Sequence, residues 1–430
     1  HILTFHPANK TAAALTGSLL SEALRDAGLD IAQPCGGQGR CGRCAVIVKS
    51  GGVRRRSTIR LSASDIDAGY ALACQSVVEG DAVVLVPEQE KIERRLVTDK
   101  TARRVAVPFP YDSARDQTVR AFFVSLDPPT LDDAVDDLSR LQRALAPLGV
   151  HGLDVPLPLM KELGARLRES DWRVTAIIET DNWQRPDGPP RLIDLIPESD
   201  DSGRRAKSET SHSVWGVAID IGTTTVSVFL VDLLTGEAID AAAEYNGQIA
   251  RGEDVISRII YAGKNNGLGE LGGLVRGTIN ELIARLTQRN HVNPKNIYKA
   301  TVAGNTTMIH LFLGIPPASI RLAPYIPAVN HPLPLVAGEA GLDINPLAAV
   351  DCLPGVASYV GADISAGVRA SGMAESDALT MFIDVGTNGE IVLGSKDWLV
   401  TCACSAGPAF EGAGVVCGMR ATRGAIEEVW

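Results

Sequence analysis

The sequence CGGQGRCGRC at residues 35–44 places three cysteines and four glycines within ten residues. With a fourth cysteine, which we expect on a distant strand, the spacing is Cys35-x5-Cys41-x2-Cys44-x29-Cys74. This is close to the C-x4-C-x2-C…C spacing of [2Fe-2S] sites, with one more residue in the first gap. Glycines suit such a loop because they let backbone N–H groups approach the bridging sulfides and hydrogen-bond them. We therefore predict a [2Fe-2S] cluster on these four cysteines.

A zinc site on Cys41, Cys44 and two other thiols is the alternative. Zinc sites favour paired short knuckles, whereas Cys74 stands alone without a second Cys or His nearby. The remaining cysteines lie in apolar contexts rich in small residues, and we predict that they are core thiols: Cys352, Cys402, Cys404 and Cys417.

Length and composition limit the possible classes of protein. A chain of 430 residues predicts two to four domains of roughly 100–200 residues each. The formal charge of -10 argues against general affinity for nucleic acid or anionic membranes. No apolar run approaches the ~20 residues that a membrane helix needs. Eight cysteines are too few for a disulfide scaffold and no signal segment is visible, so we expect a soluble, cytoplasmic protein.

The strand and helix patterns predict several folded parts. Residues 1–88 alternate short strands with one helix, which suits a small β-grasp domain. Within it we expect an edge strand at 2–5, a helix at 15–27 and strands at 44–48 and 82–86. Residues 89–107 are strongly charged and predict a linker.

A separate α/β domain is expected at residues 108–203. Its predicted elements are strands at 122–126 and 174–178 and helices at 131–146 and 157–169, followed by a polar boundary at 197–203. We find no residues in this domain that indicate chemistry.

Residues 204–430 contain a repeated pattern in which an apolar strand leads into Asp-hydrophobic-Gly-Thr. The first copy is Asp220–Thr223 and the second is Asp384–Thr387. The glycine gives a phosphate access to the backbone, the threonine donates hydrogen bonds to it, and the aspartate can hold magnesium through water. A single copy also occurs in ordinary turns. Two copies flanked by strands predict hairpins that face a triphosphate across a cleft, as in the actin, Hsp70 and sugar-kinase superfamily.

A third segment, Gly304-Asn305-Thr306-Thr307, ends a predicted strand between the hairpins and resembles the connecting motif of that superfamily. Asn305 can also cap a helix that begins near Thr306, and the two roles are compatible. His310 is predicted to be a packing residue, and residues 403–414 a loop over the nucleotide. The predicted catalytic residues are Asp220, Asp384 and Asn305, and the predicted nucleotide-binding residues are Gly222, Thr223, Thr224, Gly304, Gly386, Thr387, Asn388 and Gly407.

The cysteine loop resembles the β-grasp [2Fe-2S] ferredoxins, and its longer first gap is similar to the adrenodoxin-type branch. Together with the linker, the middle domain, Gly-Asn-Thr-Thr-Met and Gly-Pro-Ala-Phe-Glu-Gly, the whole chain resembles the ATP-dependent reductive activators of corrinoid proteins. The resemblance implies that the cluster passes one electron to a corrinoid protein and returns Co(II) to Co(I) for methyl transfer. It implies Mg-ATP as a cofactor, a corrinoid protein and a low-potential electron donor as partners, and it allows a homodimer.

The expected fold class is multidomain, α+β and α/β: a ferredoxin-like domain, a small α/β domain and an actin/sugar-kinase-like (ribonuclease H-like) domain. In that superfamily an adenosine-binding motif follows the second hairpin, whereas this sequence stops 46 residues after Asp384. We therefore expect an incomplete second subdomain.

Two other functions fit parts of the pattern. One is an electron-transfer ATPase that activates another low-potential metalloenzyme, as 2-hydroxyacyl-CoA dehydratase activators do, although those carry a [4Fe-4S] cluster between subunits and no ferredoxin domain. The other is a non-catalytic binding module whose ferredoxin part docks a reductase.

Overall fold

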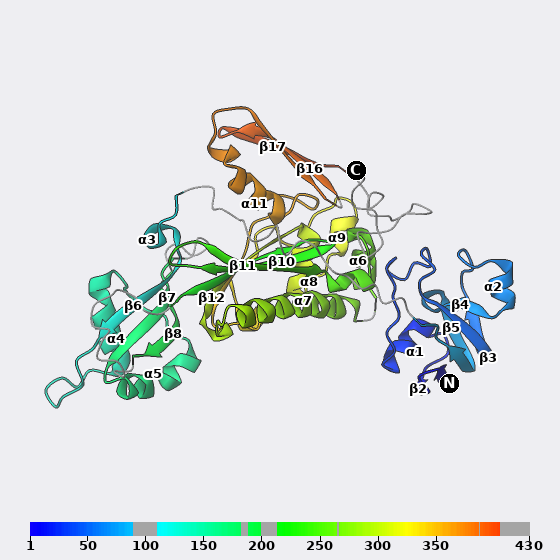
Figure 1. The fold of residues 1–430 in the computed structure, drawn as a ribbon, viewed down its shortest axis with the longest axis horizontal. Coiled ribbons are helices and arrows are strands. Elements are labelled where there is room, and N and C mark those ends of the chain that lie inside the picture. The colour runs from blue at the N-terminus through cyan, green and yellow to red at the C-terminus, as the bar shows by residue number, and fades with distance from the viewer. Residues whose placement is uncertain (89–109, 182–187, 199–212, 265, 387, 405–430) are drawn as a thin grey trace.

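Four separate β-sheets make up the framework of the part of the chain that the structure describes (Figure 1). The computed structural model describes residues 1–88, 110–181, 188–198, 213–264, 266–386 and 388–404. The N-terminal sheet lies at one end of the molecule beside helix α6 (Val255–Ala262), and the sheet of residues 119–197 lies at the other end. None of the described helices is both long enough and apolar enough to cross a membrane.

The N-terminal sheet is ferredoxin-like, with strand order β2-β1-β5-β3-β4. β1 pairs in parallel with β5, and the other neighbours are antiparallel. Helix α1 buries Leu20, Ala23 and Leu24, whose spacing of three and four residues places them on one helix face. The elements are β1 Ile2–His6, β2 Lys10–Ala13, α1 Leu20–Asp26, β3 Ala45–Arg55, α2 Ala63–Asp67, β4 Tyr70–Leu72, η1 Ala73–Gln75 and β5 Ser76–Leu85.

Three predictions for this part were wrong in detail. β1 is an interior strand, because β2 covers its outer edge. The helix begins at Leu20 and not at Leu15, whose side chain is exposed. Cys74 lies in the short helix η1 and not in a strand, since the chain turns there between β4 and β5.

The second sheet is an antiparallel meander, β6-β7-β8, covered by two helices. Leucines of α4 and α5 pack with Trp172 against it. The predicted helix at 157–169 is confirmed by α5, whereas β8 was missed. The elements are α3 Ser113–Asp116, β6 Val119–Ser125, α4 Asp137–Leu145, α5 Leu157–Glu169, β7 Arg173–Glu179 and β8 Arg191–Pro197.

The third sheet has the order β11-β10-β9-β12-β14-β13, and β12 runs parallel to both β9 and β14. The long helix α7 packs against it (Figure 1). The elements are β9 Trp215–Ile221, β10 Thr225–Asp232, β11 Ala238–Tyr245, η5 Gly247–Ala250, α6 Val255–Ala262, α7 Gly267–Arg289, β12 Ile297–Gly304, α8 Thr306–Leu313, α9 Ala318–Arg321, β13 Leu335–Val336, α10 Ala337–Ala340, β14 Ala349–Cys352 and α11 Ala362–Ser371.

The fourth sheet is the meander β15 Thr380–Val385, β16 Gly389–Ser395 and β17 Trp398–Cys404. Helix α11 packs on β15: a Cβ on Gly367 would lie 2.3 Å from the ring of Phe382. Cys352 is a core thiol as predicted, but Cys402 and Cys404 are exposed. The prediction was wrong for this pair because β17 is the edge strand of a small sheet; Cys417 lies outside the described residues.

The buried face of α7 offers a test of the packing. We expect Ile279→Ala to lower the free energy of unfolding by about 2–4 kcal/mol, because Ile279 is fully buried and its truncation leaves a cavity. The control Glu281→Ala, at an exposed position of the same helix, should change it by less than about 0.5 kcal/mol. Urea unfolding measures both values, and equal losses would contradict this packing.

Candidate cluster and nucleotide sites

The four N-terminal cysteines form two pairs. The Sγ atoms of Cys35 and Cys41 are 3.4 Å apart, and those of Cys44 and Cys74 are 3.2 Å apart. All four thiols are free, since a disulfide would need about 2.05 Å. Tetrahedral thiolate ligands with metal–sulfur bonds of about 2.3 Å lie roughly 3.8 Å apart, slightly farther than either pair. Each pair can therefore hold one iron.

The pairing fits a [2Fe-2S] cluster better than zinc. A structural zinc site gathers four ligands around one ion. Among the described residues, no three side chains of the metal-binding types are grouped to hold a single ion. Two irons with two thiolates each, joined by bridging sulfides, match the two sulfur pairs.

The loop that carries the cysteines has a backbone that depends on glycine. Gly36, Gly37, Gly39 and Gly42 all have positive φ angles, between 63° and 77°. Residues with a Cβ rarely adopt this conformation. The Gln75 amide, next to Cys74, donates to the Gly37 carbonyl at 2.7 Å and ties the loop to η1.

Hydrogen bonding within each pair favours loss of one proton. The Cys41 thiol donates to the Cys35 sulfur and lowers the pKa of Cys35 to about 4. The hydrogen bond with Cys74 also lowers the pKa of Cys44. The thiolate is the form that binds metal, so each pair presents one ready ligand.

We expect Cys74→Ser to abolish the visible absorption of the cluster and to reduce bound iron by at least about half, because a four-thiolate site loses one ligand. The control Cys402→Ser, an exposed thiol on β17, should keep full iron content. Iron analysis and absorption spectroscopy measure this effect. Unchanged iron in Cys74→Ser would exclude the predicted ligand set.

The first predicted phosphate hairpin joins β9 to β10, with Asp220 near the end of β9 and residues 222–224 in the turn. Gly304 ends the neighbouring parallel strand β12, and a Cβ there would lie 2.8 Å from the Ile221 carbonyl oxygen. This close approach requires glycine. The structure thus brings Gly222, Thr223, Thr224 and Gly304 to one edge of the sheet.

Asn305 contacts this hairpin directly. Its side-chain amide donates to Thr223 Oγ1 at 3.0 Å, and its Oδ1 accepts the Met308 N–H at 3.0 Å. Asn305 is therefore the N-cap of α8, as predicted, and also positions the threonine. A second amide, Asn246, was missed: it donates to the Gly222 carbonyl at 2.9 Å and is fully buried.

The second predicted hairpin joins β15 to β16, where the Gly386 N–H donates to the Asn388 carbonyl at 3.0 Å. Asp384 lies near the end of β15. The predicted residues Thr387 and Gly407, and the loop after residue 404, lie outside the described residues. His310 is buried in α8, and its Nδ1 makes a hydrogen bond with the Thr306 carbonyl one turn earlier. Among the described contacts it has no hydrogen bond to a predicted site residue, which agrees with the predicted packing role.

Four carboxylates, from the two hairpins and the start of α11, interact electrostatically, although among the described residues no three of them are grouped to hold one ion directly. Solvent reaches Asp220, but protein surrounds most of it, and this burial, reinforced by Asp363 and Asp384, raises its pKa to about 6. Burial raises the pKa of Glu390 to about 7, again reinforced by Asp363 and Asp384. Burial also raises the pKa of Asp363. Such mutual repulsion favours binding of a divalent cation, which prefers oxygen ligands.

Asp363 and Glu390 were not among the predicted site residues. Glu390 is the cross-strand partner of Asp384, so the register of a hairpin closed by residues 386–388 could have identified it. Asp363 lies in the first turn of α11, whose start packs on the connecting motif: a Cβ on Gly361 would lie 2.5 Å from Asn305 Cα. No local sequence pattern marks that contact.

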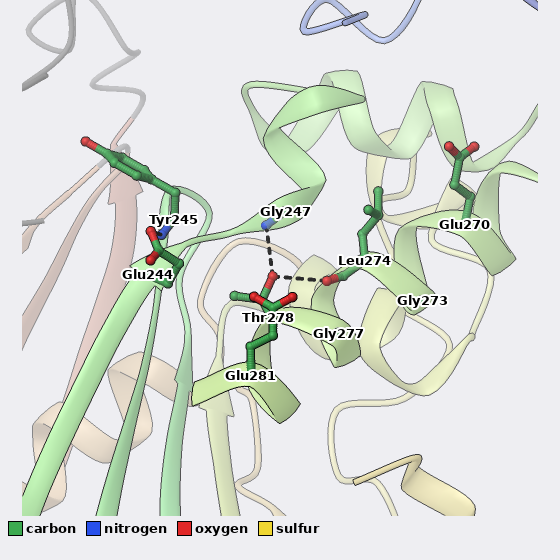
Figure 2. Close-up of a pocket in the computed structure, with 9 residues that line it drawn as sticks. All are labelled: Glu244, Tyr245, Gly247, Glu270, Gly273, Leu274, Gly277, Thr278 and Glu281. Carbon is green, nitrogen blue, oxygen red and sulfur yellow. Dashed lines mark hydrogen bonds between the residues drawn. The ribbon is translucent and has the colours of Figure 1, made fainter. Parts of the chain in front are cut away.

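A cavity of about 520 Å³ lies elsewhere, between β11 and α7 (Figure 2). None of the predicted nucleotide residues lines it. Glu244, Glu270 and Glu281 line it instead, and their charge would repel a triphosphate. The hairpins and their carboxylates, not this cavity, are therefore the candidate nucleotide site.

The raised pKa values of Asp220 and Glu390 lead to a pH dependence. Both carboxyl groups hold protons at higher pH than usual, so near pH 6 Mg²⁺ must compete with these protons. We therefore expect Mg²⁺ to bind at the candidate nucleotide site more weakly at pH 6 than at pH 8. Asp363→Asn should weaken Mg²⁺-dependent nucleotide binding by about tenfold. The exposed control Asp343→Asn should not change it. Calorimetry at both pH values measures this, and equal affinity at pH 6 and pH 8 would contradict it.

Comparison with known proteins connects these sites. Four family models match: the 2Fe-2S iron-sulfur cluster binding domain at residues 4–79, the RACo linker region at 112–202, the RACo middle region at 215–376, and the C-terminal, ASKHA domain of RACo at 378–430. A solved structure, described as a reductive activator for corrinoid, iron-sulfur protein, is 43% identical, with a TM-score of 0.64. It aligns with 100% of this chain, which covers 67% of it. The chain belongs to the RACo family of reductive activators.

Two curated proteins are also similar to the chain. The corrinoid activation enzyme RamQ of Eubacterium limosum is 30% identical over 414 residues, 96% of this chain and 62% of RamQ. The [Co(II) methylated amine-specific corrinoid protein] reductase of Methanosarcina barkeri is 26% identical over 50% of this chain and 41% of its own length. The chain therefore spans less than two thirds of either relative.

Proposed function

We propose that the chain carries out ATP-dependent reductive activation of a corrinoid protein. In this reaction one electron passes from the [2Fe-2S] cluster to the corrinoid cobalt and returns it from Co(II) to Co(I). The observation that supports this most directly is that one chain holds two sulfur pairs suited to two irons and also two hairpins whose carboxylates interact electrostatically. The names of RamQ and of the Methanosarcina reductase agree with a corrinoid protein as the acceptor.

We assign the nucleotide-site residues the following parts. The turn at Gly222, Thr223 and Thr224 donates to phosphate oxygens, and Asn305 holds Thr223 in place through its 3.0 Å hydrogen bond. Asp220 and Asp384, with Asp363 and Glu390, would hold Mg²⁺ through water. The second turn, with Gly386, Thr387 and Asn388, faces the nucleotide from the other hairpin.

The thiolates of Cys35, Cys41, Cys44 and Cys74 hold the cluster, which when bound supplies a one-electron carrier. A plant-type cluster has a reduction potential of about -400 mV, so electron transfer from it to a cobalt couple of lower potential is unfavourable. Each 59 mV of difference lowers the equilibrium constant for one-electron transfer about tenfold. ATP can supply the difference only by favouring one complex over another. A low-potential donor must then reduce the cluster again.

The organisation that we propose is a β-grasp ferredoxin domain at 1–88, a linker at 89–107, an α/β domain at 108–203 and an actin/sugar-kinase-like domain from 204 onwards. The parallel pairing of β1 with β5 and the β9–β12–β14 parallel core support the first and last of these folds. A cytoplasmic location suits the free thiols and low-potential chemistry.

The test is anaerobic visible spectroscopy of a Co(II) corrinoid protein from the same organism, mixed with the full-length protein and a low-potential reductant. We expect the Co(I) band only when Mg-ATP is present, and its loss in Cys41→Ser but not in the control Cys402→Ser. Absence of Co(I) despite a reduced cluster and bound ATP would refute a corrinoid acceptor and favour another low-potential metalloenzyme.

A further inference from the structure

Residues 247–258 contact both the cluster loop and the first phosphate hairpin. Figure 1 shows the ferredoxin-like domain beside α6, which begins within this segment. The Gln33 N–H donates to the Ala250 carbonyl, and the Glu253 N–H donates to the Pro34 carbonyl, both at 2.7 Å. Since Gln33 and Pro34 directly precede Cys35, these backbone hydrogen bonds hold the start of the cluster loop against residues 247–258.

A network of charged side chains closes the same contact. Arg251 is buried and donates to Asp30 of the ferredoxin-like domain and to Glu270 of α7, each at 2.6 Å. Glu270 also accepts from Arg25 of α1 at 2.9 Å and from Tyr261 at 2.5 Å. Glu270 thus pairs with a cation from each domain, Arg25 and Arg251. Loss of either arginine would leave the Glu270 carboxylate poorly compensated in a largely buried place.

The cluster loop itself fits against α6. The Lys264 ammonium donates to the Gly36 carbonyl. A Cβ on Gly36 would lie 2.4 Å from the Ser257 carbonyl oxygen, so only glycine allows this approach. The loop that carries Cys35 is therefore in direct contact with the nucleotide-binding part of the chain.

Arg258 connects the other end of the segment to the phosphate hairpin. Its side chain is completely buried and donates to the Thr223 carbonyl in the hairpin. It also donates to the Gly252 carbonyl at 2.9 Å and to Gln248 Oε1 at 3.0 Å. One rigid guanidinium fork thus links Thr223 to both sides of Ala250, whose carbonyl accepts the Gln33 N–H.

We infer that Arg258 is a positioning residue through which nucleotide at the Thr223 hairpin controls how firmly the cluster loop docks on residues 247–258. The inference rests on the proposed function for the identity of the ligand as Mg-ATP. A ligand shifts a docking equilibrium only by its differential affinity for the two states, and Arg258 offers a physical link for that difference. Nucleotide would thereby change where the cluster lies relative to a redox partner.

The test is hydrogen–deuterium exchange of the cluster-loaded, full-length protein, with and without a saturating non-hydrolysable Mg-ATP analogue and without any corrinoid protein. In the unaltered protein we expect nucleotide to change exchange at residues 31–37 by at least about threefold. Arg258→Lys should reduce this change to less than about 1.5-fold, because lysine cannot bridge the three acceptors. The matched control Arg276→Lys, whose guanidinium donates to the Phe312 carbonyl at 2.8 Å, should keep it.

A second variant tests the cluster end, so that the inference does not depend on the folding of Arg258→Lys. Lys264→Met should keep the nucleotide response at residues 222–226 and lose it at residues 31–37. Its control is Lys295→Met, which removes a similar lysine-to-carbonyl bond, to Ile344, elsewhere in the chain. No response at residues 31–37 in the unaltered protein, or a full response there in Lys264→Met, would overturn the inference. Because no corrinoid protein is present, failure of corrinoid reduction would not produce either result.

Discussion

The parallel pairing of β9 with β12 is the constraint on which both candidate sites depend. It brings the ends of two strands to one edge of the sheet, so that Asp220 and the turn after it lie beside Gly304 and Asn305. The Gly304 backbone passes so close to Ile221 that no side chain fits between them. The Asn305 amide can then reach Thr223, and the segment that seats the cluster loop follows β11 from the same sheet.

The two candidate sites differ in how the protein shifts the pKa values of the groups that would bind metal. At the candidate nucleotide site, burial and repulsion raise the pKa values of carboxyl groups, so that they hold protons at higher pH than usual. At the cluster site, the hydrogen bond within each thiol pair lowers the pKa of one cysteine and raises that of its partner, so one thiolate of each pair is favoured. A common segment, residues 247–258, contacts both places, so the coupling that we propose between nucleotide and electron transfer has a short physical connection.

Elements with a clear local signal were predicted well. The leucine spacing of α5 gave its bounds, and the repeated Asp-hydrophobic-Gly-Thr pattern predicted two hairpins that the structure contains. Predictions that needed a neighbour were weaker. Whether β1 lies at an edge depends on where β2 pairs, and whether Cys402 is buried depends on what covers β17.

The sequence by itself determined the ligand types and the local backbone: four cysteines at fixed spacing, glycines where φ is positive, and an asparagine that caps α8. These features depend on interactions between residues close in the chain. Only the tertiary structure decided that Asp363 joins Asp220 and Glu390, and that Arg251 and Arg258 lie between the cluster loop and the hairpin. Such contacts join residues far apart in sequence, and their geometry follows from how the sheets and helices pack.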